Sequence, residues 1–243
     1  MMKKVLVLVL AITVLFNLTS CKNIEVLNKS EENENQFIKN TFFDVLTSDK
    51  PFYMFTNNHN GWLSEVDEPQ SELMFLDEYF NSHGEEWDIS DEHDVSIGSF
   101  AVVDMDGDGV PEVIITMTLT GGEQIVLHYW NGEIYGCQFG YRAIKGLKKD
   151  GRFHSSAGAA FTFLEKLQFT DGVCESVVLA NTEDEPVDGQ WEMIYFIDGE
   201  RVPEEEYRAL FSEYENEDDA EEYSFYDETF EDDFNIAWNN VAN

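Results

Sequence analysis

The sequence has few basic residues. It contains 14 Lys and Arg against 50 Asp and Glu in 243 residues, which gives a formal net charge of −36. A nucleic-acid-binding protein needs a basic surface to neutralise phosphates, so the composition excludes nucleic acid as a partner. The same charge repels anionic lipid surfaces and attracts cations, basic proteins and basic peptides.

The sequence also lacks the common catalytic motifs. It has no His-Glu-x-x-His, no Gly-x-Ser-x-Gly, no phosphate-binding Gly-rich loop with Lys and no Cys-x-x-Cys. Its five histidines are scattered, which argues against a transition-metal site, and we expect His128 to be a hydrogen-bonded residue of a strand. Pairs of carboxylates carry no information among 50 acidic residues. The absence of these motifs favours a non-enzymatic protein over an enzyme.

Cysteine is scarce, with three residues in the chain. Cys137 and Cys174 both lie in apolar, strand-like segments. They could form one disulfide in an oxidising compartment or remain two buried thiols, and the sequence does not decide between these states.

The one long apolar run, from Val5 to Phe16, is shorter than the ~20 residues that span a bilayer. Lys3 and Lys4 precede it, and Leu18-Thr19-Ser20-Cys21 follows it. This segment resembles a bacterial lipoprotein signal with its lipobox. The resemblance implies a signal peptide over residues 1–20, a lipidated Cys21 with a flexible tether over residues 21–35, and a cell-envelope location outside the cytoplasm. The lipid would then anchor the protein to the membrane.

The most specific motif is the acidic, glycine-containing loop from Asp104 to Glu112, Asp-Met-Asp-Gly-Asp-Gly-Val-Pro-Glu. A calcium ion takes six to eight oxygen ligands, which a tight loop supplies from alternate residues. The expected ligands are the side chains of Asp104, Asp106, Asp108 and Glu112 and the backbone carbonyl of Val110.

The surroundings of the loop exclude an EF-hand, because Ile115 stands where an EF-hand has its bidentate Glu. Apolar, β-branched flanks predict a strand on each side. From Ser99 to Thr116 the segment resembles the calcium loops of FG-GAP (integrin-type) repeats and the single such loop of many uncharacterised bacterial lipoproteins. That family implies Ca²⁺ as the ligand. The chain has one copy of the motif, which argues against a propeller.

Turn signals predict antiparallel strands in the middle of the chain. Asn131-Gly132 predicts a tight hairpin between Gln124–Trp130 and Glu133–Phe139. Two further turns, Thr170-Asp171-Gly172 and Asp198-Gly199, continue the same pattern.

Helical periodicity flanks these strands. Apolar stripes predict helices from about Asn35 to Leu46, near Leu73 to Phe80, after Pro203, and from about Thr229, where Thr229 and Asp232 are spaced like a capping box. An acidic loop is expected over residues 215–222.

These features predict a single α+β domain over residues 36–243. We expect an antiparallel β-meander with flanking N- and C-terminal helices and the calcium loop between two strands. Two functions stay open. The first is a cell-surface calcium-stabilised lipoprotein that binds a protein, peptide or glycan through Trp62, Trp87 or Trp191. The second is an extracellular hydrolase of glycan or peptide with a structural calcium.

Overall fold

The structure is a computed structural model with two compact units, residues 1–40 and residues 41–243. It describes residues 32–55, 71–86, 96–118, 122–140, 143–156, 162–187, 190–225 and 228–242. The predicted signal peptide and Cys21 lie outside the described residues. Residues 32–35, expected in the flexible tether, are instead the start of a helix over residues 32–46. No helix in the described ranges combines the length and the apolar character needed to cross a membrane.

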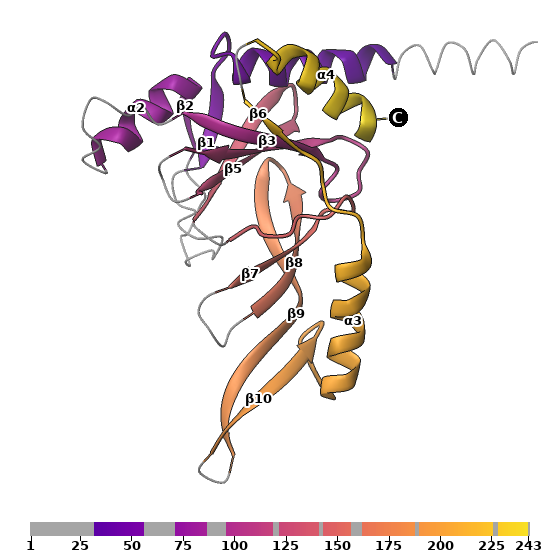
Figure 1. The fold of residues 1–243 in the computed structure, drawn as a ribbon. Helices are drawn as coiled ribbons and strands as arrows, with labels where there is room; N and C mark the ends of the chain where they lie inside the picture. Colours follow the sequence, from indigo (N-terminus) through magenta and orange to yellow (C-terminus); the bar gives the residue numbers. More distant parts are fainter. Residues whose placement is uncertain are drawn as a thin grey trace, which may run out of the picture. The chain divides into compact units, whose positions relative to one another are not determined.

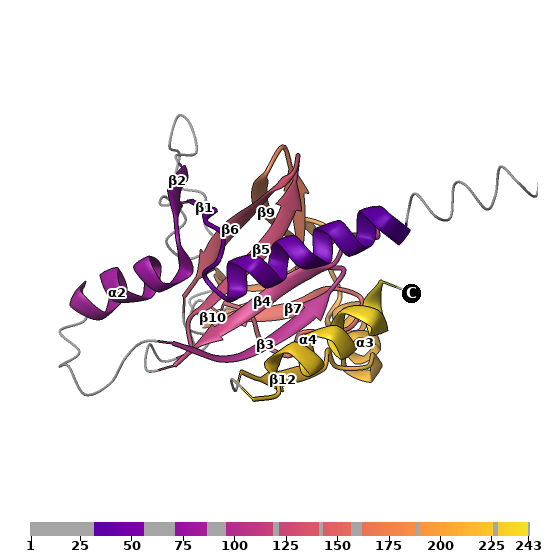
Figure 2. The same ribbon diagram turned by 90° about the horizontal axis from the view of Figure 1, so that it is seen from above.

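The first sheet has seven strands in the order β12-β3-β4-β5-β6-β1-β2 (Figures 1 and 2). Its middle is the predicted meander, in which β3, β4, β5 and β6 pair antiparallel in chain order. β1 then pairs parallel with β6, and β12 pairs antiparallel with β3. The strands are β1 Phe52–Phe55, β2 Ser71–Met74, β3 Ile97–Val103, β4 Glu112–Met117, β5 Gln124–Trp130, β6 Glu133–Phe139 and β12 Glu222–Ser224.

The second sheet is another antiparallel meander, in the order β11-β10-β9-β8-β7. Its strands are β7 Arg152–Ser156, β8 Thr162–Thr170, β9 Val173–Val187, β10 Gln190–Ile197 and β11 Glu200–Val202. The predicted fold class, α+β with flanking helices, is confirmed, and the meander is divided between two sheets.

The predicted hairpins form at the expected turns. Each has two central residues at positive φ, as the favoured two-residue hairpin turns with Asn-Gly or Asp-Gly require. These turns are Asn131-Gly132, Asp171-Gly172 and Asp198-Gly199. The first joins β5 to β6 with the predicted bounds, and the second is two residues long because Thr170 pairs with Val173.

A hydrophobic core joins the two sheets. It contains inward residues of β3 to β6 from the first sheet and of β7 to β9 from the second. Met105, from the predicted calcium loop, is fully buried in this core. Cys137 and Cys174 meet there as buried free thiols, and burial holds the pKa of Cys174 well above its ordinary value. The loop is therefore anchored in the centre of the residue 41–243 unit.

Helices cover both sheets. The predicted C-terminal helix is α4, Phe230–Val241, which contacts β3 and β12 (Figure 2). Its Phe230 and Phe234 lie around the fully buried Phe100 of β3. The predicted capping box does not form, since Thr229 makes no side-chain cap hydrogen bond. The helix after Pro203 is α3, Glu204–Asn216, and it packs on β10 through Tyr207 and Tyr195.

Two sequence predictions are wrong in detail. Leu73 belongs to β2 and not to a helix, and α2 extends from Leu76 to Glu86 through Gly84. The acidic stretch 215–222 is not wholly a loop. It begins in α3 and ends in β12, and Asp219 forms a β-bridge with Lys148 between them.

Candidate metal centre

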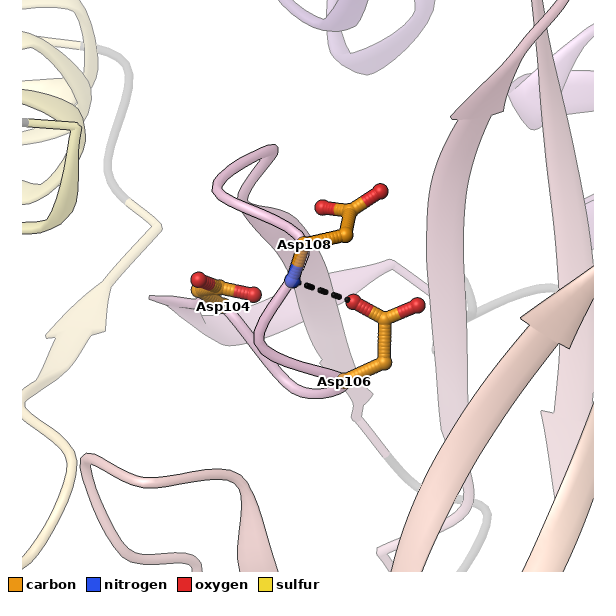
Figure 3. A group of neighbouring side chains, drawn as sticks. All are labelled: Asp104, Asp106 and Asp108. Carbon is orange, nitrogen blue, oxygen red and sulfur yellow. Dashed lines mark hydrogen bonds between the residues drawn. The ribbon is translucent and has the colours of Figure 1, made fainter.

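The acidic loop connects the paired strands β3 and β4, as the sequence predicts. β3 ends at Val103 and β4 begins at Glu112, directly opposite it in the sheet. Asp104, Asp106 and Asp108 project from the loop, each with an oxygen within 4.8 Å of the others (Figure 3). The structure thus brings together three of the five predicted ligand residues as one group.

Backbone hydrogen bonds shape the loop. Both oxygens of Asp104 accept an N–H, from Gly107 at 2.8 Å and from Gly109 at 3.1 Å. The Asp106 carboxylate accepts the N–H of Asp108 (Figure 3). The Asp108 carboxylate accepts the N–H of Val110. Gly107 and Gly109 have φ values of +85° and +90°, a region that side chains with a Cβ rarely adopt. The loop geometry therefore depends on the Asp and Gly residues together.

Glu112 is the buried residue at the β4 end of the loop. Its side chain is 3% exposed, and its Oε2 accepts the Met105 N–H at 2.7 Å. Burial is the main cause that raises the pKa of Glu112 to about 9, the Met105 N–H opposes this shift, and the nearby aspartates add to it. Glu112 is not one of the three clustered residues, and its role as a ligand remains a prediction. In EF-hand loops the residue at position 9 often reaches the ion through water, and a buried carboxylate beside the loop suits the same arrangement.

The other predicted ligand, the carbonyl of Val110, belongs to a half-buried residue after the last aspartate. Its N–H is already bonded to Asp108. Burial raises the pKa of Asp108, and the charges of Asp106 and Asp104 raise it further. A bound cation would offset this repulsion, because it adds a positive charge next to the carboxylates.

The donor set is chemically selective. The three clustered side chains offer carboxylate oxygens, with no nitrogen or sulfur among them. Oxygen ligands suit hard cations such as Ca²⁺ and Mg²⁺, while Zn²⁺ and copper sites use His or Cys. The residues therefore fit the calcium that the motif implies.

Two neighbours of the loop were missed by the sequence analysis. Gly151, at φ +81°, packs on the Met105 backbone so closely that a Cβ there would lie 2.3 Å from the Met105 carbonyl oxygen. Lys166 of β8 places its Nζ 3.7 Å from where a Cβ on Gly107 would be. The dipeptide Asp150-Gly151 signals a turn, but nothing in the sequence indicates which segment the turn contacts.

A cavity of about 680 Å³ lies beside the loop. Its lining includes Asp104, Asp150, Lys166 and Glu221. Asp150 is paired with Arg152, whose Nε lies 2.6 Å from its carboxylate. The cavity is therefore of mixed charge, with one of its acids already neutralised.

The remaining candidate residues are aromatic side chains and a histidine. Trp191 is 73% exposed on β10, while Trp62 and Trp87 lie outside the described residues. His128 is 2% exposed and stacks on Phe169, and neither of its ring nitrogens makes a hydrogen bond of normal geometry with a described residue. His128 lies in strand β5, as predicted, and its ring interacts with the Gly172 backbone outside that geometry.

No known family, curated protein or solved structure matches this chain. The likeness to FG-GAP loops therefore depends on the motif and its strand–loop–strand setting.

Proposed function

We propose that this protein is a cell-surface lipoprotein with a structural calcium site that acts as a non-enzymatic binding or accessory protein. The observation that carries the calcium site is the group of Asp104, Asp106 and Asp108 in a loop preformed between β3 and β4. Calcium would be held by these carboxylates, with the Val110 carbonyl and Glu112 completing the set as the motif implies. The ion would neutralise the loop and fix the ends of the two strands.

The lipid anchor is proposed from Cys21 and the residues before it. A location outside the cytoplasm gives the loop access to calcium at concentrations that fill weak extracellular sites of about 10⁻⁴ to 10⁻³ M affinity. The anchor and the calcium site therefore support each other.

The binding function is preferred to the hydrolase because two acidic groups near the loop, Asp150 and Glu112, are already held by other groups. In the cavity beside the loop, Asp150 is held by Arg152. Glu112 has a raised pKa, as a general acid requires, but it is buried and is not among the residues that line the 680 Å³ cavity. These residues support a structural role for the acidic groups.

The test is calcium binding to soluble protein that begins at Lys22, with magnesium as the competing ion. Asp106→Asn keeps an oxygen acceptor for the Asp108 N–H and removes the charge, while Asp171→Asn makes the same change in the β8–β9 turn. For a dissociation constant of 10⁻⁴ to 10⁻³ M, about 5 mM calcium stabilises the protein by about 1–2 kcal/mol. The expected rise in melting temperature is roughly 2–8 °C for a domain of this size.

We expect saturable calcium binding in the wild type and in Asp171→Asn, and its loss in Asp106→Asn. Diffuse, salt-sensitive binding shared by magnesium and by both variants would show that the loop is an acidic turn without a site. Mass spectrometry of the membrane fraction tests the anchor separately, because lipidation adds acyl chains to Cys21.

A further inference from the structure

The far end of the β9–β10 hairpin has an open strand edge. β11 pairs only with Tyr195, Phe196 and Ile197 of β10. Residues 190–194 pair with β9 on one side, and no other described strand pairs with their other side. In Figure 1 this part of the hairpin extends past α3. It is a two-stranded ribbon, which offers unpaired backbone groups to a further strand.

The direction of those backbone groups follows from the β10–β11 turn. Asp198 donates its N–H to Leu179 of β9, and backbone groups alternate in direction along a strand. Ile197 and Tyr195 therefore direct their backbone N–H and C=O groups toward β11. Met193 and Trp191 direct theirs the same way, past the end of β11, where the described chain supplies no partner strand.

At the opposite edge of the ribbon, the residues of β9 block the addition of a further strand. The same alternation puts the nitrogen of Pro186 on the outer edge of β9, where proline has no N–H to offer. Its neighbours Glu183, Asp184 and Glu185 add three carboxylates in a row. Proline and charge are the usual means by which proteins block a strand edge. The β10 edge has neither at Trp191 and Met193, so one edge of the ribbon is blocked and the other is not.

The side chains at the open edge are apolar. Trp191 is 73% exposed and Met193 is 45% exposed, and both lie on the face that α3 covers further along, at Tyr195. Trp and Met are enriched at protein interfaces and depleted from ordinary surfaces. The charge around them is mainly negative, since no Lys or Arg occurs between Lys166 and Arg201 in the sequence. Arg201 pairs with Glu185, its Nη1 3.5 Å from the carboxylate, and Glu183, Asp184 and Glu192 keep the ribbon acidic.

We propose that the β10 edge at residues 190–194 binds an extended segment of a basic partner protein, which pairs with β10 as an added strand. The backbone of Trp191 and Met193 supplies the hydrogen bonds, their side chains supply apolar contact, and the ribbon carboxylates attract the basic residues of the partner. A second copy of this chain fits poorly, because two copies of charge −36 would bring acidic ribbons together. The inference specifies the partner of the proposed binding function and does not depend on calcium in the loop.

The test uses two peptides of equal charge on the full soluble protein in EGTA. In one peptide lysine alternates with valine, and in the other lysine alternates with proline, which cannot supply a ladder of N–H donors. We expect the first peptide to bind and to shift tryptophan fluorescence, and the second to bind about tenfold more weakly or not at all.

Variants of Met193 locate the binding site. Met193→Pro removes an outward N–H that β9 does not use, so we expect native circular dichroism and about tenfold weaker binding of the lysine–valine peptide. Met193→Lys keeps the backbone and adds a repelling charge, and we expect weaker binding from it too. Val178→Lys, at an exposed residue of β9, is the matched control and should bind as the wild type does.

Equal binding of both peptides to the wild type and to the Met193 variants would overturn the proposal, because the attraction would then be due to net charge alone. Dimerisation of the wild type, lost in Met193→Pro and measured by sedimentation, would also overturn it by showing that a second copy occupies the edge. Loss of calcium binding in Asp106→Asn leaves these outcomes unchanged, so the two proposals fail separately.

Discussion

Protonation of His128 should make the protein less stable in mild acid. Its ring stacks on Phe169 with centroids 4.4 Å apart and lies near Tyr135 at 5.7 Å, between the two sheets. Burial lowers the pKa of His128 from 6.5 to about 4, and the Gly172 backbone opposes this only in part. The folded protein therefore holds His128 neutral at a pH at which the unfolded chain protonates it.

The sign and size follow from proton linkage. Between pH 6.5 and about 4 the unfolded state binds more protons at His128 than the folded state does. The stability that neutral His128 contributes is therefore complete above pH 6.5 and is lost as pH falls toward 4. A shift from 6.5 to about 4 corresponds to roughly 3 kcal/mol.

His128→Phe tests this, because phenylalanine fills the stacked position and cannot be protonated. Urea unfolding gives the free energy of unfolding of both proteins at several pH values between 7.5 and 4, in EGTA. We expect the difference between variant and wild type to shift by about 3 kcal/mol in favour of the variant as pH falls. Titrating carboxylates and the net charge are common to both proteins and cancel in the difference. A difference that stays constant across this pH range would refute the reasoning.

Two further changes test close backbone contacts. Gly151→Ala should destabilise the protein by about 2–4 kcal/mol and weaken calcium binding. The reason is that the new Cβ would lie 2.3–2.7 Å from Met105 backbone atoms, at a φ of +81°. Gly122→Ala, at φ +89° with open space around it, is the control for backbone strain alone. Gly136→Ala should cost about 1–3 kcal/mol in urea unfolding, because its Cβ would lie 2.7 Å from the Phe52 ring and force β1 from β6. Unchanged stability in either variant would contradict the contact in question.

The hairpins could be read from the sequence because their signals are local. Asn131-Gly132 and Asp198-Gly199 each occupy the two turn positions that need positive φ, and the neighbouring residues then have to pair. The loop between β3 and β4 was predictable for the same reason, since its aspartates and glycines determine one another's geometry within nine residues.

The partition into two sheets could not be predicted, since it depends on contacts between distant residues. β1 pairs with β6 about 80 residues later in the chain, and the short strand gives no sign of its parallel partner. The predicted acidic loop ends at Glu222, where the three-residue strand β12 begins. The place of this strand depends on its pairing with β3 and on the stacking of Tyr223 on Phe100, which are contacts with distant residues. Lys166 and Gly151 were missed at the site for the same reason.

The same contacts bear on what calcium would do for this fold at the proposed site. Each of the three clustered aspartates already accepts a backbone N–H, and Met105 fixes the loop in the core. Most of the ordering entropy of the loop is then lost when the chain folds, whether or not an ion is bound. Calcium binding should therefore stabilise the fold by neutralising like charges. Its effect should weaken with salt less than that of exposed ion pairs, because a bound ion would be in direct contact with its ligands. We therefore expect β3 and β4 to stay paired in the calcium-free protein. We also expect calcium to slow amide exchange only at the loop and at the strand ends.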